Sequence, residues 1–165
     1  MSIRNNYKHT LTASYFGYIT QAIVNNFAPL LFVTFQRSFG ISLEKIAGLV
    51  TVNFCLQLII DFVSAKFIDR IGYRVSIVAA HLFAGAGLIM LGTLPFALPD
   101  PYIGLLISIG FYAVGGGLIE VLISPIVEAC PTDKKSAAMS LLHSFYCWGH
   151  VAVILLTTLF FVTAG

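Results

Sequence analysis

Two carboxylates interrupt otherwise apolar stretches of this sequence, and they are the strongest candidates for chemistry. Asp61 and Glu120 each lie eight residues before a second acid, Asp69 and Glu128, that marks the polar end of the stretch. At about 1.5 Å per residue, each lies roughly 12 Å inside that end. An acid in hydrocarbon usually faces a bundle interior or a wet cavity. We predict that the pair relays protons or binds a cationic or hydroxyl-rich ligand; the alternative is a structural hydrogen bond to a neighbouring helix.

A second polar group lies in the last apolar stretch. His143, Cys147 and His150 are spaced as i, i+4 and i+7, which places them on one face of a helix. The first and last of them are about 10 Å apart along a straight helix, too far to share one metal ion. A polar stripe lining a cavity is therefore predicted. Tyr146 and Trp148 flank it and suit either a sugar-like solute or anchoring at the lipid interface.

An enzyme is not predicted. The sequence has no HExxH, no CxxC and no nucleophile triad, and the Gly115–Gly117 triplet lacks the Gly-Lys-Ser/Thr of a phosphate loop. The three cysteines are odd in number and lie in or beside apolar stretches, which predicts small buried hydrophobes without a disulfide framework. No cofactor and no nucleic-acid partner are expected, since there is no basic run.

The composition is that of a membrane protein. Hydrophobic residues make up 58% of the 165 residues and charged residues only 10%, whereas soluble domains carry about 25% charged residues. A soluble fold of this size cannot hide so much apolar surface, because its exterior must still be wetted. A lipid-facing exterior removes that conflict.

Five apolar stretches are long enough to cross a bilayer, which takes about 20 residues of helix. Backbone groups in lipid must be satisfied within the segment, so we predict an all-α membrane protein with five transmembrane helices. The predicted spans are Leu11–Phe35, Leu43–Phe67, Val75–Leu94, Tyr102–Val127 and Ala137–Thr163. Pro29 and Pro125 are expected to kink their helices.

Basic residues predict the orientation. Seven of the nine lie on one side of the predicted spans: Arg4, Lys8, Lys66, Arg70, Arg74, Lys134 and Lys135. The positive-inside rule places that side, with the N-terminus, in the cytoplasm of a multi-pass plasma (inner) membrane protein. Five helices then leave the C-terminus outside, and this odd number predicts that residues 1–165 are an incomplete N-terminal transmembrane domain.

The connection after the second span resembles a known loop motif. It reads Ala65-Lys66-Phe67-Ile68-Asp69-Arg70-Ile71-Gly72-Tyr73-Arg74. Asp69, Arg70, Gly72 and Arg74 match the G-x-L-A-D-R-x-G-R-R loop of major facilitator superfamily transporters, between helices two and three. The resemblance implies a cytoplasmic charge cluster that gates the inward opening. The alternative is ordinary positive-inside anchoring.

Two further stretches resemble the fucose permease group of sugar–proton symporters within that superfamily. Gly117-Leu118-Ile119-Glu120, with Ser124-Pro125 after it, is similar to the group's G-x-x-E-T-x-x-N-P signature, and residues 143–149 are similar to its Q-T-F-N-S-F-G segment. The Asn25-Asn26 pair resembles its first-helix Asn pair. The group's first-helix acid falls near Ala28 or Pro29 and its fifth-helix Arg near Met139, so neither is present.

The resemblance implies a secondary active transporter fragment for proton-coupled uptake or efflux of a small solute such as a sugar. Glu120 would be the proton or ligand acid, with His143, Tyr146, Asn25 and Asn26 lining the cavity. Asp61 is the sixth residue predicted for the substrate or proton site. The expected partners are the lipid bilayer, a small-molecule solute, protons and the missing C-terminal half of the transporter; the sixth helix is absent as well. The alternative is a non-transporting helix-bundle module that binds a partner protein or lipid.

Overall fold

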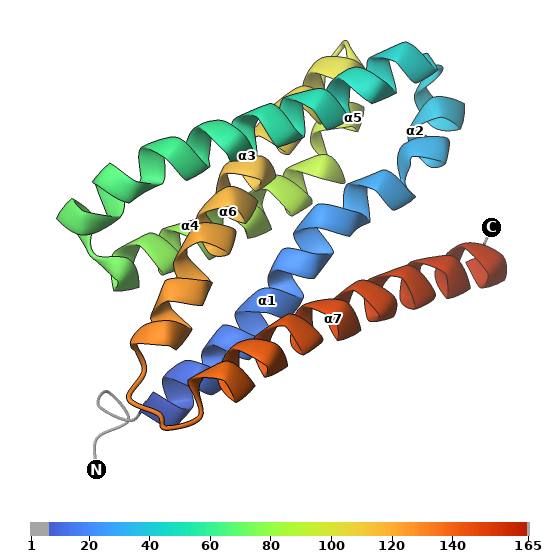
Figure 1. Ribbon diagram of the computed structural model, residues 1–165. Coiled ribbons are helices and arrows are strands. Elements are labelled where there is room, and N and C mark those ends of the chain that lie inside the picture. The colour runs from blue at the N-terminus through green and yellow to red at the C-terminus, as the bar shows by residue number, and fades with distance from the viewer. Residues whose placement is uncertain (1–6, 165) are drawn as a thin grey trace.

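The structure, a computed structural model, describes residues 7–164, and every regular element among them is a helix (Figure 1). Arg4, one of the residues that set the predicted orientation, lies outside the described residues. The helices are α1 (Tyr7–Leu30), α2 (Phe32–Phe39), α3 (Leu43–Ile71), α4 (Tyr73–Leu91), α5 (Leu94–Ala97), α6 (Pro101–Ala129) and α7 (Lys135–Ala164).

Five helical segments are long and apolar enough to cross a membrane, as predicted. They are Tyr7–Phe39, Leu43–Ser64, Tyr73–Leu91, Pro101–Ala129 and Lys135–Ala164. An all-α, multi-pass membrane fold is therefore confirmed. The bounds differ from the predicted spans by a few residues, mainly because α4 ends at Leu91 and the short helix α5 takes up the rest of the third apolar stretch.

The first span is broken in its C-terminal part. α1 contains Pro29 and ends one residue later, and α2 begins at Phe32. Proline has no backbone N–H and its ring crowds the preceding turn, so the helix cannot continue unchanged past it. The N–H of Leu31 bonds instead to the carbonyl of Ala28 at 3.0 Å. Pro125, by contrast, lies inside α6 without ending it.

The link between the second and third spans is much shorter than predicted. The expected connection ran over 68–74, but α3 continues to Ile71 and α4 begins at Tyr73, which leaves Gly72 alone between them. Gly72 has φ +88°, a left-handed conformation that glycine adopts without strain. Its N–H bonds to the carbonyl of Ile68 at 2.8 Å. Two antiparallel helices are thus joined by one glycine.

α6 is the central helix, and its glycine triplet explains how three neighbours approach it. A Cβ on Gly115 would meet backbone atoms of Ala84 in α4, and one on Gly117 would come within 3.1 Å of Ile60 in α3. A Cβ on Gly116 would lie 3.0 Å from Val24 in α1. Small residues let transmembrane helices come this close. Most of the α6 side chains between Gly104 and Val127 that face these neighbours are buried.

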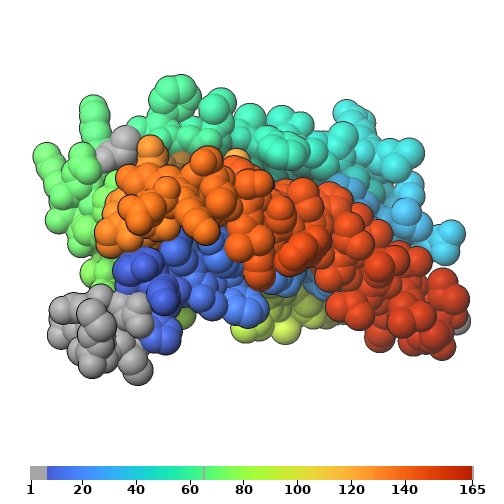
Figure 2. Space-filling view, turned by 60° about the horizontal axis from the view of Figure 1, so that its bottom comes forward, coloured from blue at the N-terminus to red at the C-terminus, as the bar shows by residue number. Residues whose placement is uncertain are grey.

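α7 packs mainly on α1 and contacts α6 much less. Figure 2 shows α7, orange to red, along the face turned toward the viewer, with blue α1 beside its N-terminal half. The two helices touch closely at Gly149, where a Cβ would lie 3.0 Å from the Cα of Ile19 and 3.1 Å from the Cβ of Ala22. Beyond that crossing α7 is largely exposed, as expected for a lipid-facing helix.

The cysteine prediction is half wrong. All three cysteines are free, as expected, but only Cys130 is buried, while Cys55 and Cys147 are exposed. Both exposed thiols belong to membrane spans, where the neighbouring medium is hydrocarbon. An apolar stretch of sequence does not distinguish a side chain that faces protein from one that faces lipid, because both surroundings are apolar.

Candidate functional site

A small polar pocket lies where α1, α6 and α7 meet. Its volume is about 200 Å³. The side chains that line it are Tyr18, Gln21 and Asn25 of α1, Glu120 of α6, and His143 and Tyr146 of α7. All six belong to membrane spans, where polar groups are rare and tend to face one another.

Helical spacing brings these side chains together. Tyr18, Gln21 and Asn25 are spaced as i, i+3 and i+7 and share one face of α1. His143 and Tyr146 are three residues apart and share one face of α7. Each helix therefore contributes a polar stripe, and the packing of α7 on α1 turns the two stripes toward Glu120 of α6.

The Glu120 carboxylate is held by an amide. The Nε2 of Gln21 donates a hydrogen bond to the Oε2 of Glu120 at 3.2 Å. Glu120 is exposed, whereas Gln21 has only 2% of its surface exposed. The Oε1 of Gln21 is buried and has no hydrogen-bond partner among the described residues. The buried amide thus orients an accessible acid.

A chain of three hydrogen-bonding side chains runs beside this pair. The Nε2 of Gln57, from α3, donates to the Oδ1 of Asn25 at 3.1 Å. The Nδ2 of Asn25 in turn donates to the phenol oxygen of Tyr146 at 3.5 Å. The chain links α3, α1 and α7 through the middle of the bundle. Such interhelical bonds contribute about 0.6 kcal/mol each on average in membrane proteins.

Aromatic rings form one wall of the pocket. The Tyr18 ring meets the His143 ring edge to face, with 5.7 Å between centroids, and the Tyr146 ring in the same manner at 6.1 Å. The Tyr18 hydroxyl is hydrogen-bonded to the Ser124 hydroxyl at 2.8 Å. This bond fixes the Tyr18 ring against α6, one turn beyond Glu120.

Gly116 provides the space that the amides occupy. A Cβ there would lie 3.1 Å from the Nε2 of Gln57 and 3.7 Å from the Oε1 of Gln21. The glycine therefore allows two glutamines from two helices to lie against the backbone of α6. A larger residue would press first on the Gln57 amide, which holds Asn25.

Four of the six predicted solute-site residues meet in the pocket: Asn25, Glu120, His143 and Tyr146. Asn26 does not line it, since its Nδ2 donates to the Ala22 carbonyl of its own helix at 2.7 Å. Asp61 does not line it either, although its carboxylate is near enough to interact electrostatically with Glu120.

Asp61 and Glu120 lie at similar levels on neighbouring helices. A Cβ on Gly117, three residues before Glu120 in α6, would come within 3.1 Å of Ile60, the residue before Asp61 in α3. The depth of the two acids in a membrane stays a prediction.

The predicted gating residues flank the glycine link. Asp69 and Arg70 lie in the last turn of α3, and Arg74 lies in the first turn of α4, on either side of Gly72. All three charged side chains are exposed. In the described part of the chain none of them has a hydrogen-bond or ion-pair partner. They are free to meet another surface at this end of the molecule.

Four residues of the cluster were missed from the sequence: Tyr18, Gln21, Gln57 and Ser124. A signal existed for three of them. Tyr18 and Gln21 precede Asn25 at helical spacing in a stretch without charges, and Gln57 lies four residues after Asn53 and four before Asp61. Only the packing of α3 and α6 on α1 shows the partners of Gln57 and Ser124.

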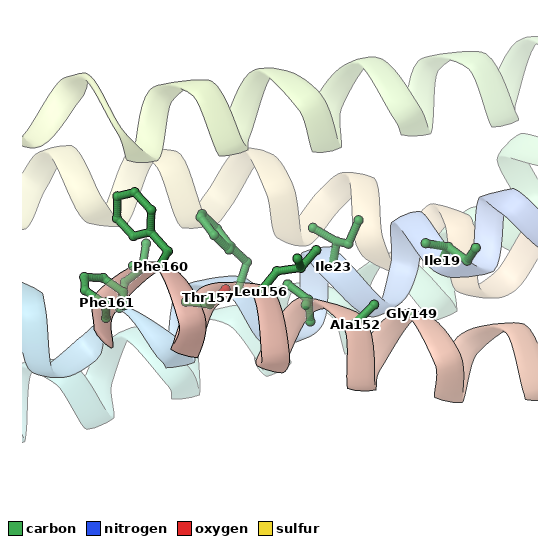
Figure 3. Close-up of a pocket in the computed structure, with 11 residues that line it drawn as sticks. Ile19, Ile23, Gly149, Ala152, Leu156, Thr157, Phe160 and Phe161 are labelled. Atoms are coloured by element: carbon green, nitrogen blue, oxygen red, sulfur yellow. The ribbon is translucent and has the colours of Figure 1, made fainter. Parts of the chain in front are cut away.

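A second hollow, which we call the apolar groove, lies between α1 and α7 and has a volume of about 560 Å³ (Figure 3). It begins at Gly149 and widens as the two helices diverge (Figure 1). Its lining is aliphatic and aromatic apart from Thr157: Ile19, Ile23, Phe27, Leu31, Gly149, Ala152, Val153, Leu156, Thr157, Phe160 and Phe161.

Within residues 7–164, no group of three or more His, Cys, Asp or Glu side chains is placed to hold a metal ion. Comparison of the chain with protein-family models, curated proteins and solved structures finds no match. The chemistry of the polar pocket therefore provides the basis for a functional assignment.

Proposed function

We propose that this chain is the N-terminal part of a secondary active transporter of the major facilitator type, and that the polar pocket binds its solute. The observation that carries the proposal is the accessible carboxylate of Glu120, held by Gln21 inside a membrane span beside a 200 Å³ pocket. Ionisable residues within the membrane typically belong to substrate or proton pathways. A C-terminal half would enclose the solute from the other side.

Two other features support the same reading. The α3–α4 link carries Asp69, Arg70 and Arg74 without partners at the end of the molecule where the loop motif predicts a gate. The pocket draws on three different helices, so a rigid-body movement of one helix pair against another would open or close it. With the basic residues inside, the N-terminus lies in the cytoplasm of a plasma or inner membrane.

The decisive experiment is transport by the full-length protein in proteoliposomes under a pH gradient. Glu120→Gln keeps the size and the hydrogen bond to Gln21 but removes the charge, and it is expected to abolish uptake. Glu128→Gln, at the exposed end of the same helix, is the matched control and is expected to transport normally. Normal uptake by the Glu120 variant would overturn the assignment.

The apolar groove favours a second candidate, a module that binds a partner protein or lipid without transport. Its Leu156 and Phe160 are 68% and 62% exposed and adjoin a hollow of 560 Å³. A partner helix would cover these side chains. Cross-linking from Leu156→Cys to a second protein, together with unchanged function in Glu120→Gln, would select this candidate over the transporter.

A further inference from the structure

The polar pocket contains an acid without a counter-charge. Glu120 is its only carboxylate, no Lys or Arg lines it, and His143, which does line it, makes no hydrogen bond or ion pair with Glu120. The only hydrogen-bond partner of the carboxylate among the described residues is the neutral amide of Gln21. A carboxylate within a membrane span is costly without a positive partner. A ligand that brings the positive charge would therefore be favoured over a neutral or anionic one.

Most of the amide and hydroxyl groups in and beside the pocket are already engaged with one another. The amide nitrogen of Gln21 is used on Glu120, and the Asn25 amide uses its oxygen on Gln57 and its nitrogen on Tyr146. The Tyr18 hydroxyl is paired with Ser124. A polyhydroxylated solute needs many free amide donors and acceptors, and this pocket offers few. Apart from the His143 ring, the groups with spare capacity are acceptors: the Glu120 carboxylate and the Oε1 of Gln21, which has no partner among the described residues. Such oxygens accept from the N–H groups of an ammonium ion.

The walls suit an organic cation. Tyr18 and Tyr146 present aromatic rings that meet at 6.1 Å, and ring faces attract ammonium groups. A hard metal ion requires about six or more oxygen ligands, which one carboxylate does not supply. The volume of 200 Å³ is below the roughly 300–1,000 Å³ of drug-sized sites. A small ligand with one charged head fits these limits.

We propose that the polar pocket binds a small organic ammonium compound, with Glu120 as its counter-ion and Tyr18 and Tyr146 packing around the cationic head. This inference rests on the proposed function, since it names the class of solute that the transporter site would take. It would replace the sugar expected from the family resemblance.

The test uses isothermal titration of the protein in nanodiscs with four probes: 2-phenylethylamine, its neutral isostere 2-phenylethanol, the anion phenylacetate, and D-glucose. The amine is expected to bind at least ten-fold more tightly than any other probe. Glu120→Gln is expected to remove that preference, and Glu128→Gln is expected to keep it. Tyr146→Phe retains the ring and should bind the amine, whereas Tyr146→Leu should bind it several-fold more weakly.

Each other outcome is informative. Equal binding of the alcohol and the amine, or preferential binding of D-glucose, overturns the cation class while the pocket stands as a solute site. Retained amine preference in Glu120→Gln overturns the counter-ion role. If no probe binds, the cation class is rejected, and only transport that is unaffected in Glu120→Gln would reject the proposed function as well.

Discussion

The polar pocket and the apolar groove are bordered by the same two helices, yet they present opposite chemistry. On α1, Tyr18, Gln21 and Asn25 face the pocket, whereas Ile19 and Ile23 face the groove. With 3.6 residues per turn, adjacent positions such as Tyr18 and Ile19 point about 100° apart. A helix can therefore present a polar side and a lipid-compatible side within the same few turns.

The two hollows also differ in what fills them. In the pocket, polar side chains bond to each other across α1, α3 and α7, so it is shaped by directional contacts. In the groove no side chain makes a hydrogen bond to a side chain of another helix among the described residues, and its shape follows from the divergence of α7 from α1. Substitutions that alter side-chain geometry should therefore destabilise the pocket, and substitutions that add a polar or charged group should destabilise the groove.

The largest effect is expected when the chemistry of the two hollows is exchanged. Leu156→Asp places a charge in the groove, with a cost of up to about 2.5–3.5 kcal/mol, the value for an acid at a helix centre. Glu120→Leu removes the charge from the pocket and should leave thermal stability equal or higher. Melting temperatures in nanodiscs would compare the two variants, with Leu156→Ala as the uncharged control. A destabilised Glu120→Leu protein would contradict the distinction between the hollows.

A somewhat smaller effect is expected from disrupting the crossing that both hollows share. Gly149→Leu forces a side chain against Ile19 and Ala22, and such overpacking typically costs about 1–3 kcal/mol. Gly85→Leu is the matched control, because nothing lies within 4 Å of the added Cβ. Unfolding of both variants in a graded detergent series would show the difference, and equal stability would argue against a tight α1–α7 contact.

Asn25 and Asn26 are adjacent on α1, but only Asn25 lines the pocket, so substitutions of the two residues can be compared directly. Asn25→Leu breaks its bonds to Gln57 and Tyr146, with an expected loss of about 0.6–1.7 kcal/mol per bond in a membrane protein. Asn26→Leu removes only a bond to the carbonyl of Ala22 in its own helix, so little change is expected. The same unfolding assay compares them. A larger loss for Asn26 would reverse the assignment of the pair.

The smallest effect concerns the turn that joins the pocket helix α6 to α7. Burial raises the pKa of the Cys130 thiol, so less reactive thiolate is present near neutral pH and maleimide labelling should be slow. A thiol with a higher pKa ionises at a higher pH. Labelling of Cys130 should therefore accelerate only as the pH rises above the range in which an ordinary thiol ionises. Cys55→Ser and Cys147→Ser isolate Cys130 for the measurement.

The matched control adds Asp133→Cys, at an exposed position in the same turn, to a background with Cys130→Ser. This thiol should label faster at neutral pH. Equal rates for the two thiols would contradict the burial of Cys130.

A membrane-impermeant reagent would also reveal which side of the membrane the turn faces. Labelling from outside intact cells would contradict the cytoplasmic orientation.

The amino-acid sequence was sufficient to predict the helices, the spans and the presence of acids within them. Hydrophobicity over about 20 residues is a local property, and backbone hydrogen bonding in lipid leaves helix as the solution. The bounds of α3 and α4 were predicted less well, because whether Asp69 and Arg70 end a helix or lie on its last turn depends on one glycine's conformation.

The sequence did not determine which polar residues meet. Asn25 and Asn26 are chemically identical and adjacent, and only the packing of α7 and α3 on α1 assigns one to the pocket and the other to its own backbone. Tyr18 and Ser124 are 106 residues apart and lie in hydrogen-bond contact. Such pairs depend on the direction of each side chain around its helix and on the rotation of neighbouring helices, which are properties of the tertiary structure alone.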